Sequence, residues 1–336
     1  METQNSDDEK FKYTYENCWK FIIRPPRDNY ALSELNLDEI IIDSKETCIR
    51  EDYEIKSKRG FLMQCSFYRI DPKKRDPLIR PVVIYLHGNS SCRVEGKKMA
   101  IYLLNKGIDL FVFDFPGCGK SEGEYISLGY HEKDDVRIIV DYVASLPGVG
   151  NIGLWGRSMG AATTLLYSDE RIKAQCVDSP FADFRDLSIT LCKKEINIPE
   201  FIINTVLYFI KKTVKKKNDM DIDELRPIDY VEKSKTPTFF IHAMKDELIP
   251  YKHTINMYEK YGGIKFINIV EGKHNTPRPK HIINKIIDFF DKYLRDNINI
   301  DDYNNECEEE SENEDENNED EENENNNIIN EKENNK

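Results

Sequence analysis

The sequence predicts an α/β protein built on a mostly parallel, doubly wound sheet that opens with an antiparallel hairpin. Three observations lead to this prediction. Strand-like and helix-like patterns alternate along most of the 336 residues. The run Pro81–Leu86 is apolar throughout, as in a strand that is covered on both faces. Residues 151–167, NIGLWGRSMGAATTLLY, have the pattern of a buried strand, a sharp turn and a helix. Repeated strand–helix order is typical of parallel sheets with helices on both faces.

The first half of the predicted sheet comes from residues 53–113. Two alternating runs within Tyr53–Ile70 meet at Arg59-Gly60, which indicates an antiparallel hairpin. The sequence then predicts a strand, a helix and a second strand, at Pro81–Leu86, Val94–Leu104 and Leu110–Phe113.

The second half of the sheet begins after a helix that stops at Pro147-Gly148. Its buried face is expected to carry Val136, Ile139, Val140 and Val143. Further strands are predicted at Ile152–Trp155, Ala174–Val177, Thr238–Ile241 and Ile264–Val270. A closing helix is predicted from the apolar residues Ile282, Ile283, Ile286, Phe289, Phe290 and Tyr293.

Composition divides the chain into an N-terminal arm, a main domain and a tail. Residues 1–40 are expected to form an arm on the main domain, which spans residues 41–297. From Asp301 to Lys336 there are seventeen acidic residues and two lysines, a local charge of −15 in a chain whose net charge is −14. The rest of the chain is therefore nearly neutral. A segment so acidic and so rich in Asn cannot bury enough apolar surface to fold, so residues 298–336 are predicted to be a disordered tail.

Residues 183–236 interrupt the strand–helix alternation with more chain than a crossover needs. We expect a helical cap on the sheet here, whose apolar run Phe201–Ile210 would line a pocket beneath it. The alternative is a helix that lies on a membrane surface. Peripheral membrane contact would then use the lysines that follow the apolar run, which are Lys211, Lys212, Lys215, Lys216 and Lys217.

The start of the chain, METQNSDDEK, lacks the basic and apolar regions of a secretory signal. No run approaches the roughly 18 apolar residues of a membrane span. The eight cysteines are scattered without the paired spacing of a metal site. These features predict a cytoplasmic protein with reduced thiols, with peripheral membrane contact as the variant. The charge balance gives no reason to expect nucleic-acid binding, and no metal or organic cofactor is implied.

The stretch Gly156-Arg157-Ser158-Met159-Gly160 has the form of a nucleophile elbow. In such an elbow a serine sits in a strained turn between a strand and a helix. The two flanking positions must be glycine, because a side chain there would collide with the neighbouring strand or helix. The turn also aims the first amides of the helix at the place where an oxyanion would form.

A second stretch, Gly119-Lys120-Ser121-Glu122-Gly123, has the same five-residue spacing. The loop Asp114–Cys118 separates it from the strand before it, and no helix that begins with small residues follows. The strand–turn–helix context is therefore missing. We expect Ser158 to be the nucleophile and Ser121 to lie in a structural turn.

A serine nucleophile needs a base and a carboxylate that orients the base. His274 follows the last predicted strand in a loop that can reach Ser158, whereas the other five histidines have structural explanations, among them His242 at the end of a strand. Asp246 follows the strand Thr238–Ile241 by one short loop and is the preferred carboxylate. Asp178, at the end of the preceding strand, is the alternative.

The oxyanion hole is expected where the strand Pro81–Leu86 ends in His87-Gly88-Asn89. Gly88 would let the backbone approach the substrate. The amides of Asn89 (with Ser90 as the alternative) and Met159 would then stabilise the oxyanion together.

These motifs resemble those of the α/β-hydrolase superfamily. The HGN loop, the turn DFPGCGKSEG at residues 114–123, the GRSMG elbow, Asp246 and His274 occur in that family's order over roughly residues 50–295. The likeness is closest to the serine aminopeptidase-like or peptidase-like branch. Within this branch it is closest to uncharacterised plant and protist members that share FIIRPPR, an LQCS-like strand (here Met63–Ser66) and GLWGRSMGA. The resemblance implies hydrolysis of an ester, thioester or amide.

The sequence thus supports a serine hydrolase that acts through an acyl-enzyme on a small acyl substrate such as a lipid, an ester or an acyl-protein. An ester or thioester is preferred to an amide, since an apolar cap suits an acyl chain. The alternative is a non-catalytic protein, associated with membranes or acting as a scaffold, that retains the fold.

Overall fold

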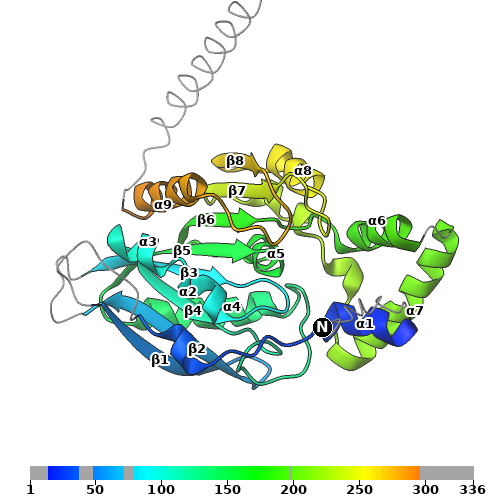
Figure 1. Cartoon of the computed structure of the whole chain (residues 1–336), viewed down its shortest axis with the longest axis horizontal. Coiled ribbons are helices and arrows are strands. Elements are labelled where there is room, and N and C mark those ends of the chain that lie inside the picture. The colour runs from blue at the N-terminus through cyan, green and yellow to red at the C-terminus, as the bar shows by residue number, and fades with distance from the viewer. Residues whose placement is uncertain (1–13, 38–47, 72–78, 197–198, 296–336) are drawn as a thin grey trace, which may run out of the picture. The chain divides into compact units, whose positions relative to one another are not determined.

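The structure is a computed structural model that describes residues 14–37, 48–71, 79–196 and 199–295 (Figure 1). These residues all belong to a compact unit that ends at Arg295. The acidic tail predicted for residues 298–336 lies outside the described residues.

One eight-stranded sheet organises the described residues, with the strand order β1-β2-β4-β3-β5-β6-β7-β8. β1 pairs antiparallel with β2, β2 pairs antiparallel with β4, and the remaining neighbours are parallel. The predicted fold class is confirmed. The strands are β1 (Cys48–Lys56), β2 (Leu62–Ile70), β3 (Arg80–Leu86), β4 (Asp109–Phe113), β5 (Val149–Arg157), β6 (Ile172–Asp178), β7 (Thr238–Ala243) and β8 (Lys265–Val270).

Helices cover both faces of this sheet. α2 and α3 contact β4, and α3 also contacts α9, which crosses β5 and β6. On the other face, α5 packs on β5 and β6, with α4 against β5 and α8 against β7. Successive side chains of β5 point to opposite faces of the sheet. Leu154 packs in the core that contains Val136 of α4, whereas the Trp155 ring lies 6.0 Å from the Phe290 ring of α9. The α-helices are α1 (Tyr15–Ile23), α2 (Arg93–Lys97), α3 (Ala100–Asn105), α4 (Glu132–Ser145), α5 (Met159–Leu166), α6 (Phe184–Ile196), α7 (Glu200–Asn218), α8 (Lys252–Lys260) and α9 (Lys280–Arg295).

One predicted element differs in the structure. The single helix expected at Val94–Leu104 is two short helices, α2 and α3, with a turn between them. Gly96 weakens the helical pattern at this point. It cannot be replaced by a stronger helix former, because a Cβ at Gly96 would lie 2.7 Å from the Tyr85 ring of β3.

The strand register brings the loops that carry the predicted site residues to one edge of the sheet. Leu86 pairs with Gly156, and Arg157 pairs with Asp178, so β3, β5 and β6 end side by side. β7 extends the same parallel series. The carboxyl ends of neighbouring parallel strands are where α/β proteins usually place their sites.

The segment between β6 and β7 contains α6, α7 and three short 3-10 helices, Ile222–Glu224, Pro227–Asp229 and Val231–Lys233. An ion pair between Asp183 and Arg226 and the backbone hydrogen bond from Phe184 to Leu225 tie its two ends together. Figure 1 shows α6 and α7 beyond the carboxyl ends of β5 and β6, with α1 beside α7.

The N-terminal residues that are described reach this insertion and also the loop after β4. The Tyr15 hydroxyl donates to the Phe209 carbonyl oxygen at 2.9 Å, which joins α1 to α7. Arg27, in the FIIRPPR stretch, donates to the carbonyl oxygens of Gly117, Ser121 and Gly123. The FIIRPPR and GKSEG motifs therefore contact each other.

Candidate active site

Ser158 occupies the sharp turn between β5 and α5, with φ 52° and ψ −114°. A residue other than glycine rarely adopts a positive φ, so this backbone is strained as expected. A Cβ at Gly156 would lie 2.3 Å from the Gly160 carbonyl oxygen, and a Cβ at Gly160 would lie 2.0 Å from that of Leu86. The predicted reason for the two glycines, a collision with the adjoining helix and strand, is confirmed.

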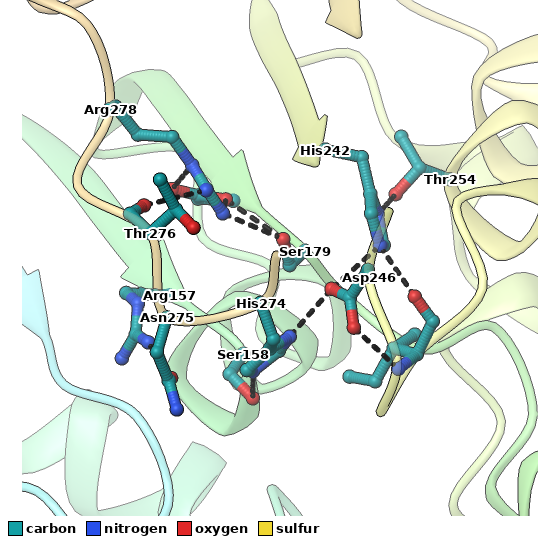
Figure 2. A network of polar contacts seen from close by, with 12 residues as sticks. Arg157, Ser158, Ser179, His242, Asp246, Thr254, His274, Asn275, Thr276 and Arg278 are labelled. Atoms are coloured by element: carbon teal, nitrogen blue, oxygen red, sulfur yellow. Dashed lines mark hydrogen bonds and ion pairs between the residues drawn. The ribbon is translucent and has the colours of Figure 1, made fainter. Parts of the chain in front are cut away.

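The structure brings Ser158, His274 and Asp246 into one hydrogen-bonded line (Figure 2). His274 Nε2 lies 3.0 Å from Ser158 Oγ, and His274 Nδ1 lies 2.6 Å from Asp246 Oδ2. Since a carboxylate only accepts, Nδ1 carries the ring hydrogen, and Nε2 is left to accept from the serine hydroxyl. Ser158 is 8% exposed and His274 is 7% exposed, so the line is almost shielded from water.

The loop after β7 holds the Asp246 carboxylate in its ionised form. Oδ1 accepts from the backbone amides of Leu248 and Ile249 at 2.9 and 2.8 Å. Burial would raise the pKa of Asp246, but the hydrogen bonds from His242, His274 and the Ile249 amide outweigh burial and hold that pKa well below its ordinary value.

His242 also belongs to this site, although the sequence predicted only that it ends a strand. Its Nε2 lies 2.8 Å from the Ile249 carbonyl oxygen and 3.1 Å from Asp246 Oδ2, so this nitrogen faces two acceptors and carries the hydrogen. Its Nδ1 lies 2.7 Å from Thr254 Oγ1. Figure 2 shows the ring on the far side of Asp246 from His274. A histidine in an apolar strand four residues before a carboxylate was the available signal.

Asp178, the alternative carboxylate, has a different partner. Arg278 Nε and Nη2 donate to its two oxygens at 2.8 and 2.7 Å, and Arg278 Nη1 donates to the Thr276 carbonyl oxygen. Bidentate pairs of this kind fix geometry well. The pair joins the end of β6 to the loop that carries His274, while the Asp178 carbonyl oxygen accepts from the Ser158 amide at 2.7 Å.

Hydrogen bonds to the His87 ring and to the Gly88 carbonyl oxygen fix the HGN loop. His87 Nε2 accepts from the Phe115 amide, so Nδ1 carries the hydrogen and donates to the Gly88 carbonyl oxygen at 2.8 Å. The Ser91 amide donates to the same carbonyl oxygen, which closes a turn in which Ser90 has φ 60°. Asn89 follows β3 within this turn, and Met159 is the first residue of α5, so its N–H has no acceptor within the helix.

Arg157, inside the elbow motif, links Glu95 of α2 to the loop that carries His274. Its guanidinium donates to Glu95 at 3.2 Å and to Asn275 Oδ1 at 2.6 Å. A Cβ at Gly88 would lie 2.9 Å from the same guanidinium. A side chain at this position would therefore displace the end of the Arg157 side chain.

The five lysines of α7 do not form one free cationic cluster. Lys211 pairs with Asp221 and Asp223, and Lys215 pairs with Asp219. Lys217 lies 4.4 Å from the centre of the Trp19 ring. Lys212 and Lys216 are exposed and form no ion pair with a described residue. Among the described residues, α7 and the other helices lack the combination of length and hydropathy that a membrane span requires.

Comparisons with known proteins agree with the fold. A family model described as the alpha/beta hydrolase fold matches residues 81–218. The chain is 28% identical over 250 residues to the uncharacterized protein YqkD of Bacillus subtilis, which covers 71% of this chain and 81% of that one. It is 24% identical to the putative esterase YitV of the same species, over 64% of this chain and 89% of that one.

A solved structure of the Pyrococcus furiosus esterase Pf2001 superposes with a TM-score of 0.60 and 22% identity, over 80% of this chain and 99% of that one. The described structure thus has the α/β-hydrolase fold, and the matches support a place for the chain in the α/β-hydrolase superfamily.

Proposed function

We propose that this protein is a serine hydrolase that cleaves an acyl ester or thioester through an acyl-enzyme. The observation that carries the proposal is the buried line from Ser158 through His274 to Asp246, with contacts of 3.0 and 2.6 Å. The strained backbone of Ser158 adds support, as do Gly156 and Gly160, where close contacts leave no room for a side chain. A protein that does not catalyse a reaction has no need for that geometry.

In the proposed reaction, Ser158 Oγ attacks the acyl carbonyl carbon while His274 Nε2 takes the hydroxyl proton. Asp246 keeps the Nδ1 hydrogen in place and stabilises the charged ring without taking its proton. The tetrahedral intermediate then collapses, the bond to the leaving alcohol or thiol breaks, and His274 returns the proton to it. Water repeats these steps on the acyl-enzyme and releases the acid.

The amides of Asn89 and Met159 are the proposed oxyanion donors. The loss of one such donor typically lowers turnover about 10²–10³-fold. His87, which ties the HGN loop to Phe115, and Glu95, which binds Arg157, would hold the Asn89 amide in position.

Relatives and structural neighbours that are named as esterases support a hydrolytic function in general. We propose an ester or thioester substrate rather than an amide. We also propose that residues 183–236 cover the site and that the chain is most similar to serine aminopeptidase-like members.

Labelling by a fluorophosphonate probe, with turnover of a short-chain ester, tests the reaction. The wild type and Ser121→Ala should label and turn over, whereas Ser158→Ala and His274→Ala should lose at least about 10³-fold in rate, as expected for members of one catalytic unit. Asp246→Asn should retain the fold and lose most of the rate. If the folded wild type neither labels nor hydrolyses the ester, the non-catalytic alternative replaces this proposal.

A further inference from the structure

The outer face of α7 exposes large apolar side chains that no described element covers. Phe201, Tyr208 and Phe209 are 71%, 54% and 52% exposed, and Ile202 and Val206 of the same helix are exposed as well. Single exposed apolar residues are ordinary in folded proteins. Five of them between residues 201 and 209 form one exposed apolar group, of the kind that marks an interaction site.

This face is distinct from the one that joins α7 to the rest of the protein. Ile203, Ile210 and Val214 are buried and form the inner stripe of the helix. At 3.6 residues per turn, Phe201 and Tyr208 lie on the opposite side of the helix from that stripe. A pocket for an acyl chain is concave and encloses most of its ligand. Side chains that are more than half exposed on the outside of a helix do not fit that role.

The apolar residues share their face with two lysines. Phe201, Tyr208, Lys212 and Lys216 are spaced by seven, four and four residues, which places them on one side of the helix. Lys212 Nζ lies 4.5 Å from the centre of the Tyr208 ring. Lys216 forms no ion pair with any described residue. The outer face is therefore apolar in its first half and cationic in its second half.

We propose that this outer face, defined by Phe201, Tyr208, Phe209, Lys212 and Lys216, docks on the surface of an anionic lipid bilayer. Aromatic side chains favour the interface between headgroups and acyl chains. Lysines at the polar end of the same face attract anionic headgroups. The charge of the face selects this occupant, because Lys212 and Lys216 form no ion pair with a described residue, whereas Lys211 and Lys215 are already paired with Asp221 and Asp219.

Flotation of the full-length protein with lipid vesicles tests the proposal. One set of vesicles is phosphatidylcholine, and the other contains about 30% phosphatidylserine. The wild type should bind the second set at least about fivefold better, since each cation near an anionic surface contributes roughly a factor of five. Lys212→Gln with Lys216→Gln should remove that preference, and Phe201→Ser with Phe209→Ser should weaken binding to both sets by about tenfold or more.

Two control variants match these changes elsewhere on the surface. Leu32→Ser removes an exposed apolar residue, and Lys252→Gln with Lys260→Gln removes two exposed lysines of α8. Both should bind as the wild type does. Fluorophosphonate labelling of every variant reports separately on the proposed hydrolase, which this proposal does not require. Absence of wild-type binding to either vesicle, equal loss in the α8 control, or a dimer that Phe201→Ser dissociates would overturn it.

Discussion

The chain contains the pattern Gly-x-Ser-x-Gly twice, and the serines of the two copies differ in their hydrogen-bond partners and their backbone conformation. Ser158 contacts a histidine and lies in a strained backbone. Ser121 is buried, and its hydroxyl donates to the Asp114 carbonyl oxygen at 2.6 Å and accepts from the Gln64 amide at 2.8 Å. The prediction that Ser121 lies in a structural turn is confirmed. Both of its hydrogen-bonding capacities serve the backbone, so little remains for chemistry.

The glycines of the two copies are also required for different reasons. Gly119 and Gly123 have φ of +46° and +94°, so the turn needs their backbone freedom, and a Cβ at Gly119 would also lie 2.4 Å from the buried Asp114 carboxylate. Gly156 and Gly160 have no positive φ and are needed for close approach to neighbouring backbone. A short motif therefore gains a function only from the elements on either side of it.

The first predicted difference between the copies concerns their glycines, when one methyl group is added to each. In Gly160→Ala the Cβ would meet the Leu86 carbonyl oxygen, so β3 and the HGN loop must move. A displacement of about 1 Å in a site can cost roughly 10²-fold in rate. We expect at least that loss in fluorophosphonate labelling, with lower stability.

The matched change is Gly123→Ala, where the nearest atom would be 3.1 Å away but φ is +94°. We expect a loss of about 1–2 kcal/mol in unfolding free energy from the disfavoured backbone, with an unchanged labelling rate for the folded protein. Urea unfolding and labelling kinetics on both variants measure the two effects. Equal losses of labelling rate would show that the copies do not differ in this way.

A second difference is expected when each serine becomes alanine. Ser121→Ala leaves the partly buried Gln64 amide without its acceptor, which should cost about 1–3 kcal/mol of unfolding free energy. Ser158→Ala loses only the contact with His274 and should cost less than about 1 kcal/mol while it abolishes labelling. Ser188→Ala, which removes a hydroxyl bonded to the Phe184 carbonyl oxygen within α6, is the control and should change stability by less than about 0.5 kcal/mol. A Ser121→Ala protein as stable as this control would contradict the structural role.

Motif context explains what the sequence could predict. The elbow, the loop histidine and the carboxylate after β7 each follow a strand, and the ends of parallel strands meet at one edge. The positions of Ser158, His274 and Asp246 were therefore accessible from order and spacing. The eight-stranded sheet followed in the same way from the alternation of strand and helix patterns.

Contacts between distant segments were not accessible, because no local pattern encodes them. Arg278 binds Asp178 across 100 residues, and Arg27 binds the loop after β4. The lysines of α7 appeared as one cluster in the sequence, but Lys211 and Lys215 have acidic partners in the structure. The predicted helix at Val94–Leu104 failed for a similar reason, since the contact of Gly96 with Tyr85 is tertiary.

The smallest predicted effect distinguishes the copies by pH. The Ser121 hydroxyl bonds only to neutral backbone groups, so the cost of Ser121→Ala should be the same at neutral and acidic pH. The Ser158 site depends on Asp246, whose pKa is held well below its ordinary value in part by the hydrogen bond from His242. A depressed folded pKa contributes stability above the unfolded pKa, about 3.9 for Asp, and this stability is lost as pH falls through the folded pKa.

His242→Leu removes that donor and keeps a side chain of similar size. Its cost in unfolding free energy should be largest near neutral pH and should shrink by about 1 kcal/mol as pH falls below about 4, because the lost part is a hydrogen bond to a charged group. His242→Gln retains an N–H that reaches the place of Nε2 and should retain most of the pH-dependent part. Urea unfolding of both variants between acidic and neutral pH provides the measurement. A constant deficit for His242→Leu would mean that His242 contributes packing and its bonds to Ile249 and Thr254, and that other groups hold Asp246 in its ionised form.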